Sequence, residues 1–451
     1  MAGTRYKIWR KSELKELIPR NFKGLTGMFS SLRSPNFRLY FFGQCFSLCG
    51  TWIQSVAMGW LVYRLTGSVA MLTIVTFVNQ IPCLLITPFT GVLSDRMNRW
   101  KIITVTQLLF MLAAATLATL TLAGLIETWH LIAISAFAGT VAAIEAPARQ
   151  SFYSNLVPPE DLSNAIAFNS LTINGARFIG PVLGGVMIAA MGEGWCFTVN
   201  AASYIVVIVA LMMMKLPPFV RRGSEANVVA EMREGIEYIG GHLPIRTMIF
   251  FVAALSFIGL PFMSVMPAFV KDVLGGDSRM FGLFSSCLGV GTMSAALYLA
   301  SRKKVRGLGK VATITSFMLG ISLVLLSLSN NLFAACIIGV PLGFAFIGSV
   351  ATANTLLQTM VDPTKRGRVM SFFTMAFAGM MPLGVLLYGL LSKWLSLEHI
   401  LLGSGVGCLL TCLIYEYFRP VVRAAAQQRY VSKSRKRGVV GEFAKAIDNP
   451  F

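Results

Sequence analysis

Residues 91–101 read GVLSDRMNRWK, a short polar stretch with one aspartate and three basic residues between two long apolar runs. The run before it, 69–93, and the run after it, 101–123, are each long enough to cross a bilayer, which takes about 20 mostly apolar residues. Similar runs recur from Leu39 to near the end of the chain, twelve in all. The sequence therefore predicts an all-α membrane protein with twelve transmembrane helices. We expect the spans at 39–63, 69–93, 101–123, 128–148, 163–191, 195–215, 246–270, 280–301, 308–328, 331–358, 368–392 and 397–418.

The composition agrees with a chain whose main solvent is lipid. It is 55% hydrophobic and 13% charged, with a mean hydropathy of +0.69, whereas about a quarter of the residues of a typical soluble domain are charged. All eight cysteines fall inside apolar runs, and the three histidines are scattered. A structural zinc site needs four clustered ligands, so we interpret the cysteines as packing residues and expect no metal and no cofactor.

The basic residues predict the orientation of the spans. Of the 39 lysines and arginines, the predicted loops on one side hold only Arg64, Lys271, Arg279 and Lys393, and Arg177 lies within a span. The rest lie on the side that holds both termini. Because lysine and arginine resist translocation, this side is predicted to be cytoplasmic. The net charge of +20 thus reflects the orientation of the spans in the membrane, which argues against a nucleic-acid partner. We expect the basic ends to contact lipid headgroups.

A long polar connection divides the chain into two sets of six spans. We expect a second set related to the first, because five residues of 157–185 recur 204 positions later; chance matches between glycine-rich helices are the alternative. The matched residues are Val157, Pro159, Gly175, Gly180 and Gly185 with Val361, Pro363, Gly379, Gly384 and Gly389. The predicted parts are a basic cytoplasmic segment 1–38, a six-helix bundle 39–215, a cytoplasmic linker 216–245, a second bundle 246–418 and a basic tail 419–451.

The stretch 91–101 resembles the hallmark loop of the major facilitator superfamily, G-x-L-x-D-R-x-G-R-[RK], with Asn98 where glycine is usual. Asparagine tolerates a left-handed backbone better than most residues. The stretches 51–54, 65–68, 146–150 and 156–158 are similar to the transmembrane secretion effector branch, which includes enterobactin exporters. The resemblance implies the major facilitator fold, export of a small molecule such as a siderophore, proton antiport and a bacterial inner membrane.

The same loop supplies three predicted gating residues, Asp95, Arg96 and Arg99, and the fourth is Glu145 of the fourth span. An aspartate at the cytoplasmic edge can meet the positive N-terminus of the eleventh span, near Arg368. We expect Glu145, at the end of the fourth span, to pair with Arg99, as an acidic residue there does in several members of the superfamily. This latch would form only when the halves touch on the cytoplasmic side. Glu145 could instead carry protons, or be an inert carboxylate at the membrane interface.

Arg177 is the one charge predicted near mid-membrane, about 14 residues into the fifth span. A guanidinium there costs at least about 3 kcal/mol on insertion scales, so it should face a cavity or a partner. We interpret it as a substrate or coupling residue; the alternative is that carbonyl and amide groups satisfy it. Neutral residues expected to line the same cavity are Gln54, Asn79, Asn174 and Asn354, with Gln80, Asn169, Asn200 and Gln358.

Arg177 precedes a run of small residues, Gly180, Pro181, Gly184 and Gly185. The run resembles the antiporter motif of drug and proton exchangers, although Ala176 stands where that motif has glycine. Glycines allow close helix approach, so ordinary helix packing is the alternative to an antiport role.

We therefore expect an exporter of a small amphipathic or siderophore-like molecule that works by alternating access and is coupled to protons. A lipid or lysophospholipid translocator of the same fold, or a membrane sensor or scaffold that does not transport, are the alternatives. An enzyme is not expected, because the sequence shows no metal-ligand set, no nucleophile elbow and no phosphate-binding loop.

Overall fold

The computed structural model describes residues 30–216, 228–302, 307–362 and 365–436, without the side chains of 87–89, 91–96, 228–232 and 428–436. The described residues form twelve helices or helix groups long and apolar enough to span a membrane. The first six are α3 (Pro35–Thr66), α4 (Val69–Arg96), α5 (Arg99–Leu122), α6 (Thr128–Leu156), α7 (Leu162–Met191) and α8 (Glu193–Met212), with short turns η1 (Ser30–Arg33) and η2 (Pro159–Asp161).

A linker helix, α9 (Val228–Gly241), leads into the second six spans. Two of these spans are interrupted, each by a π-helical turn, which is a feature often found at functional positions. The seventh is α10 (Leu243–Ile258), α11 (Phe262–Ala268) and η3 (Phe269–Val273); the eleventh is α15 (Arg366–Thr374), η4 (Met375–Gly379) and α16 (Met380–Leu391). The others are α12 (Ser278–Ser301), α13 (Leu308–Ser327), α14 (Leu332–Met360) and α17 (Leu397–Lys436).

The spans lie close to their predicted positions, but two helices run well past their expected ends. The fourth was expected to end at 148, after Pro147, but α6 continues to Leu156. A proline removes one backbone hydrogen bond and need not end a helix whose next turns can pack. The last helix continues past the expected end of its span at 418 to Lys436. The extension of α6 matters most, because it places Arg149 inside a helix and not in a loop.

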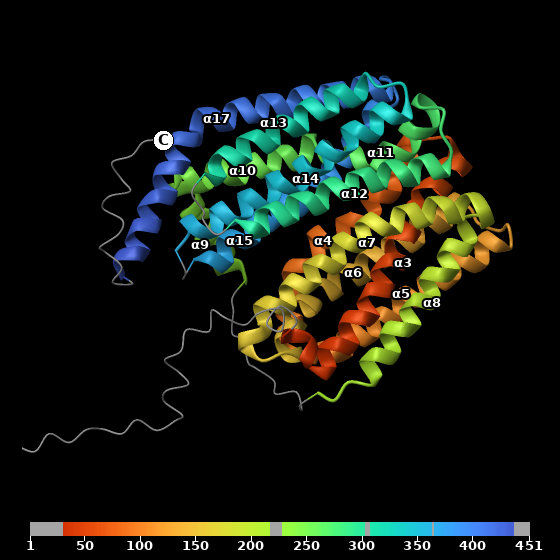
Figure 1. The fold of residues 1–451 in the computed structure, drawn as a ribbon, viewed down its shortest axis with the longest axis horizontal. Coiled ribbons are helices and arrows are strands. Elements are labelled where there is room, and N and C mark those ends of the chain that lie inside the picture. Colours follow the sequence, from red (N-terminus) through yellow and green to blue (C-terminus); the bar gives the residue numbers. More distant parts are fainter. Residues whose placement is uncertain (1–29, 217–227, 303–306, 363–364, 437–451) are drawn as a thin grey trace, which may run out of the picture.

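The helices form two bundles of six, the first half (α3–α8) and the second half (α10–α17), which Figure 1 shows as red to lime and green to blue. With twelve spans, both ends of the described chain emerge on the same side, which we call the terminal face; the other side is the opposite face. The halves touch through α7 with α12 and α4 with α16. In Figure 1 the two sets of helices run apart toward the end that carries α9 and α15.

Two of the three repeated glycine pairs pack in matching ways; in the third, a Cβ atom on Gly379 would meet Leu84, whereas one on Gly175 meets nothing within 4 Å. A Cβ atom added to Gly180 would collide with Trp52 of the first span, and one added to Gly384 with Phe257 of the seventh. Likewise, one added to Gly185 would meet α12, the eighth span, and one added to Gly389 would meet α4, the second. The first, second and fifth spans thus correspond in packing to the seventh, eighth and eleventh. This arrangement supports the expected internal repeat about an axis along the membrane normal.

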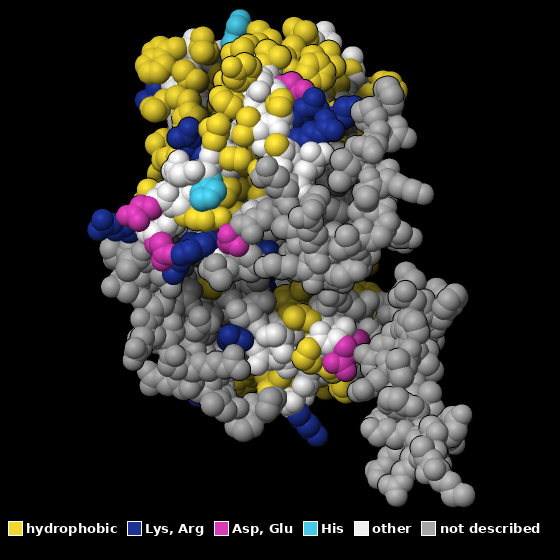
Figure 2. Space-filling view, turned by 90° about the vertical axis from the view of Figure 1, so that its left-hand side faces the viewer, with side chains coloured by type: hydrophobic (Ala, Val, Ile, Leu, Met, Phe, Trp, Pro, Cys, Tyr) yellow, Lys and Arg dark blue, Asp and Glu magenta, His cyan; other side chains and the backbone are white. Residues whose placement is uncertain are grey.

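Charged side chains gather on the terminal face. Figure 2 looks at the end of the molecule where α9 and α15 lie, and shows Lys, Arg, Asp and Glu side chains there below a largely hydrophobic region. On α9, Glu234 forms ion pairs with Lys365 and Arg368, the latter with a 2.6 Å N–O distance. The linker helix is therefore held against the start of the eleventh span.

Candidate functional site at the seam between the halves

Arg177 lies in the middle of α7, where the two halves meet. Its Cζ atom is 5.1 Å from the ring centroid of Trp52 on α3 and 6.0 Å from that of Phe346 on α14. Trp52 belongs to the first half and Phe346 to the second, so the guanidinium bridges the seam. A cation over an aromatic face gains about 2 kcal/mol or more when both groups are removed from water. The two rings therefore offset part of the cost of placing this charge within the membrane.

The hydrogen-bonding capacity of Arg177 is not filled. Its Nε atom is buried and has no hydrogen-bond partner among the described residues. A guanidinium has five N–H donors and no acceptor, and leaving a buried donor unpaired costs about 1–3 kcal/mol. The site is thus a half-buried cation, flanked by aromatic rings and short of acceptors, which suits an anionic or acceptor-rich ligand.

Small residues of α7 create this geometry. Gly180 makes room for the Cβ atom of Trp52, and a Cβ atom on Gly184 would lie 3.3 Å from the backbone of Ile53. Because α3 and α7 approach so closely, the indole of Trp52 reaches the level of Arg177, one helical turn before Gly180. On the neighbouring side of α7, the carbonyl oxygen of Pro181 would lie 2.6 Å from a Cβ atom on Gly282. The run of small residues therefore packs α7 against both halves.

The neutral residues expected beside Arg177 have local partners in this conformation. Gln54 accepts a hydrogen bond from Asn200 at 2.7 Å, and Asn79 donates one to the Ser135 carbonyl at 3.2 Å. Gln54 is two residues from Trp52, about 200° around α3, so it faces α8 and not Arg177. The other two bond within their own helices: Asn174 donates to the Ser170 carbonyl at 2.8 Å, and Asn354 accepts from Gln358 at 3.0 Å. None of these hydrogen bonds involves Arg177.

The predicted latch is only partly described. The side chains of Asp95 and Arg96 lie outside the described residues. Arg99 donates to the carbonyl oxygen of Ser151 at 3.3 Å and to Asn155 at 3.1 Å.

Glu145 lies deeper in the first half, with Gln107 at 3.0 Å and Arg149 at 3.9 Å. At the start of α15, where Asp95 was expected, the linker residue Glu234 holds Lys365 and Arg368. Because the latch belongs to a conformation closed at the terminal face, its pairing remains a prediction.

On the opposite face, contacts between the halves close the seam. The Tyr63 hydroxyl of α3 donates a hydrogen bond to Asp272 of η3, and the Lys271 ammonium lies 5.4 Å from the centre of the Tyr63 ring. Trp60 stacks on Phe281 of α12 with ring centroids 6.2 Å apart. Sequence patterns did not single out Tyr63 or Asp272, because an aromatic residue and a carboxylate near span ends are common and only the fold pairs them.

A Tyr63→Phe variant tests this closure. We expect it to shift the protein toward a conformation open at the opposite face, because a hydrogen bond to a charged group contributes about 1.5–3 kcal/mol, enough to change the ratio of conformations about tenfold or more. The measurement is the distance between spin labels at the exposed residues Leu125 and Leu328, which lie in opposite-face loops of the two halves. An unchanged distance distribution would show that the hydrogen bond does not hold the seam.

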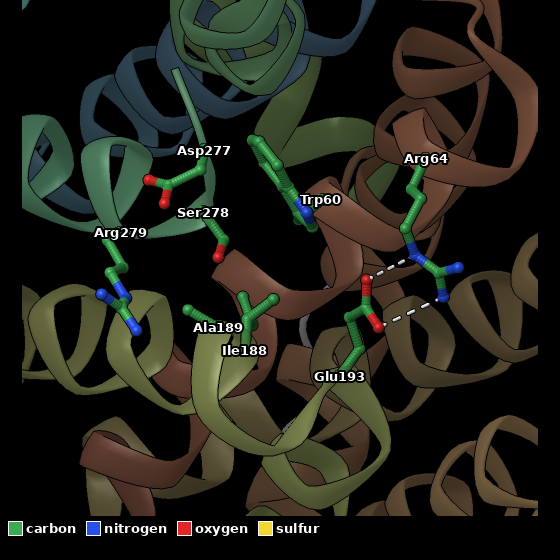
Figure 3. Close-up of a pocket in the computed structure, with 8 residues that line it drawn as sticks. All are labelled: Trp60, Arg64, Ile188, Ala189, Glu193, Asp277, Ser278 and Arg279. Carbon is green, nitrogen blue, oxygen red and sulfur yellow. Dashed lines mark hydrogen bonds and ion pairs between the residues drawn. The ribbon is translucent and has the colours of Figure 1, made fainter.

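A cavity of about 690 Å³ lies outside this closure, at the opposite-face ends of α3, α7 and α8 and the start of α12. Figure 3 shows Arg64 and Glu193 joined across one wall, with Asp277 and Arg279 on the other side. The Arg64–Glu193 pair is bidentate, with N–O distances of 2.8 and 3.2 Å. Because α7 and α12 meet between this cavity and Arg177, at Gly185 against Gly282, we interpret it as a vestibule and not as the central site.

Two six-helix bundles related by an internal repeat, with a polar site where they meet, are the architecture of a membrane transporter for small molecules and not of an enzyme. The chain belongs to the transmembrane secretion effector family of the major facilitator superfamily, whose pattern matches residues 26–440. It is 25% identical over 386 residues to the staphyloferrin A transporter of Staphylococcus aureus, covering 84% of this chain and 95% of that protein. It is 22% identical over 392 residues to macrolide efflux protein A of Streptococcus pyogenes, with the same coverage of both chains.

The fold matches solved transporters. One is a bacterial homologue of the human lysosomal transporter Spinster in an inward-facing, unoccupied conformation, with a TM-score of 0.61 and 13% identity over 90% of this chain and 98% of the other. The predicted superfamily and fold class are therefore confirmed, and the chain is a multi-pass bacterial membrane protein.

Proposed function

We propose that this protein exports a small amphipathic or siderophore-like molecule across the bacterial inner membrane by alternating access, in exchange for protons. Its relatives include a siderophore transporter and a macrolide efflux protein. The observation on which the proposal depends is Arg177, a cation short of acceptors at the seam. A ligand bound there touches both halves, so its binding can depend on how the halves are arranged.

The proposed direction of transport rests on the likeness to efflux proteins and is compatible with the proposed orientation. The excess of basic residues on the side of the termini favours a cytoplasmic terminal face. The contacts at Tyr63 and at Gly185 then lie on the outer side, and the present conformation opens toward the cytoplasm. An exporter binds its substrate in this conformation.

Transport into inverted membrane vesicles tests the proposal, with staphyloferrin A, a macrolide and a headgroup-labelled lysolipid as substrates, each with and without a protonophore. Uptake of staphyloferrin A or the macrolide that the protonophore abolishes would support it. Uptake of the lysolipid alone would indicate a lipid translocator instead. If the chain moves none of the three, the proposed function is wrong.

An Asp95→Asn variant tests the latch in the same assay. The amide keeps the size of the carboxylate but loses its charge at the helix N-terminus, where a cap contributes about 0.5–2 kcal/mol. We expect a few-fold to about thirtyfold slower uptake with normal expression, because the conformation closed to the cytoplasm becomes less populated. Asp161→Asn is the matched control, since this side chain makes no capping hydrogen bond. Equal rates for both variants would remove the role assigned to Asp95.

A further inference from the structure

The proposed function needs a group that carries protons, and Arg177 is unsuited to this because a guanidinium stays protonated. Glu145 is a carboxylate within a span, and its residue surface is only 4% exposed. It is the 18th residue of α6, which is 29 residues long, so it lies well inside the helix. Arg99, its expected partner, instead bonds to Ser151 and Asn155, one to three turns nearer the terminal face. In this conformation Glu145 therefore interacts with Gln107 and Arg149 and not with Arg99.

A polar stripe connects Glu145 with the terminal side of the molecule. Glu145, Arg149 and Tyr153 are four residues apart on α6, so they lie on one side of the helix. Arg149 lies 3.9 Å from Glu145, and Tyr153 donates a 2.5 Å hydrogen bond to Asn169 of α7. The Arg149 side chain is 37% exposed. An arginine within a span avoids lipid, so we infer that this exposed part faces water.

Gln107 can stabilise Glu145 in both protonation states. Its amide nitrogen donates to the carboxylate at 3.0 Å, which suits the ionised form. Its amide oxygen is buried and has no partner among the described residues. A rotated amide would present that oxygen to a protonated carboxyl group, which donates. The Tyr40 ring of α3 packs against the same group of residues, 5.6 Å from the ring of Tyr153.

Arg149 is the nearest cation that the structure describes beside Glu145. The titratable groups that interact with the carboxylate are Arg149 and Tyr153 on α6, Tyr40 on α3 and Tyr204 on α8. Arg149 is the cation among these four. A buried carboxylate without a nearby cation binds a proton rather than remain charged. Arg149 lies 3.9 Å from Glu145, beyond hydrogen-bonding distance, so a rotation of its side chain would separate the two charges.

We propose that Glu145 is the proton-carrying residue of the transport cycle, with Arg149 as its switch. When Arg149 moves away, Glu145 takes one proton from water and becomes neutral. When Arg149 returns, as in this conformation, the carboxyl group gives the proton to water on the terminal side and forms the ion pair. The guanidinium keeps its proton throughout. The assignment to a transport cycle rests on the proposed function, whereas the titration of Glu145 does not.

Infrared difference spectroscopy of the purified protein tests the titration without any substrate. Between acidic and alkaline buffer, we expect the wild type to lose a carboxyl C=O band that is absent from the Glu145→Gln variant. The exposed carboxylate Glu160 provides the matched control, so Glu160→Gln should keep the band. A band that persists in Glu145→Gln would overturn the proposal.

Staphyloferrin A transport in proteoliposomes tests the coupling. Glu145→Gln should still exchange staphyloferrin A at equal concentrations on both sides, because this exchange needs no net movement of protons. It should lose accumulation driven by a pH gradient, which reaches about tenfold per pH unit for one-for-one exchange. Accumulation equal to the wild type, or loss of exchange as well, would contradict the proposal. If the wild type does not move staphyloferrin A, the proposed function is in doubt, and the infrared result still decides the titration.

A second variant covers the case in which Glu145→Gln does not fold. In Arg149→Gln the carboxylate loses its neighbouring cation, so Glu145 should keep its proton, and its C=O band, to more alkaline buffer than in the wild type. A band that disappears at the wild-type pH would show that Arg149 does not control Glu145.

Discussion

Replacing Arg177 with glutamine should lower export at least about thirtyfold while the protein is still expressed and folded. Truncating one partner of a buried, hydrogen-bonded charge pair costs about 2–5 kcal/mol, and the proposed substrate supplies the acceptors that Arg177 lacks. The substitution also removes the free-energy cost of placing a charge within the membrane, so the stability of the folded protein should be unchanged or higher. The measurement is uptake of staphyloferrin A or a macrolide into inverted vesicles, normalised to protein content.

Two further variants separate the charge from its surroundings. Arg177→Lys keeps the charge but loses the planar guanidinium that lies over Trp52, so it should recover only part of the activity. Lys393→Gln removes an exposed cation on the opposite face and should leave export unchanged. Normal export by Arg177→Gln would show that carbonyl and amide groups satisfy the arginine and that its role is structural.

Hydropathy, charge and a short loop motif predicted most of the fold. Twelve spans follow from hydrophobicity, because every backbone group in lipid must be bonded within a helix. The repeat could be predicted because the glycines at 180, 185, 384 and 389 are needed where backbones touch, and a Cβ atom at any of them would collide. The end of α6 could not be predicted, because Pro147 and the polar residues after it have the composition of a loop.

The seam was harder to predict than the spans. Arg177 could be singled out because a charge deep in a span is costly, but its partners Trp52 and Phe346 lie far away in the sequence and in different spans. Gln54 and Asn79 have the right chemistry for a cavity, but helix rotation decides which way a side chain points, and hydrophobicity determines that rotation only weakly here. If the end of α6 had been predicted correctly, Arg149 would have been recognised as a second charge within a span.

Replacing Gly185 with valine should abolish transport, because the larger side chain would keep the two halves apart at the opposite face. A Cβ atom there would lie 2.6 Å from the carbonyl oxygen of Ser278 and 2.9 Å from the Cα atom of Gly282. Both are backbone atoms of α12, in the other half, so no side-chain rotation can relieve the clash. Overpacking of this kind costs about 1–3 kcal/mol, comparable to the free-energy differences between transporter conformations. The labels at Leu125 and Leu328 should move apart as transport is lost.

Gly175 is the matched control for Gly185 because it lies on the same helix and a Cβ atom there meets nothing within 4 Å. Gly175→Val should therefore transport normally. The internal repeat leads to a further expectation, because Gly389 packs against Thr73 of α4 as Gly185 packs against α12. Gly389→Val should produce the same opening and the same loss of transport from the other side of the seam. A loss of transport in Gly175→Val equal to that in Gly185→Val, with no change in label distance, would mean that helix propensity and not closure of the seam limits transport.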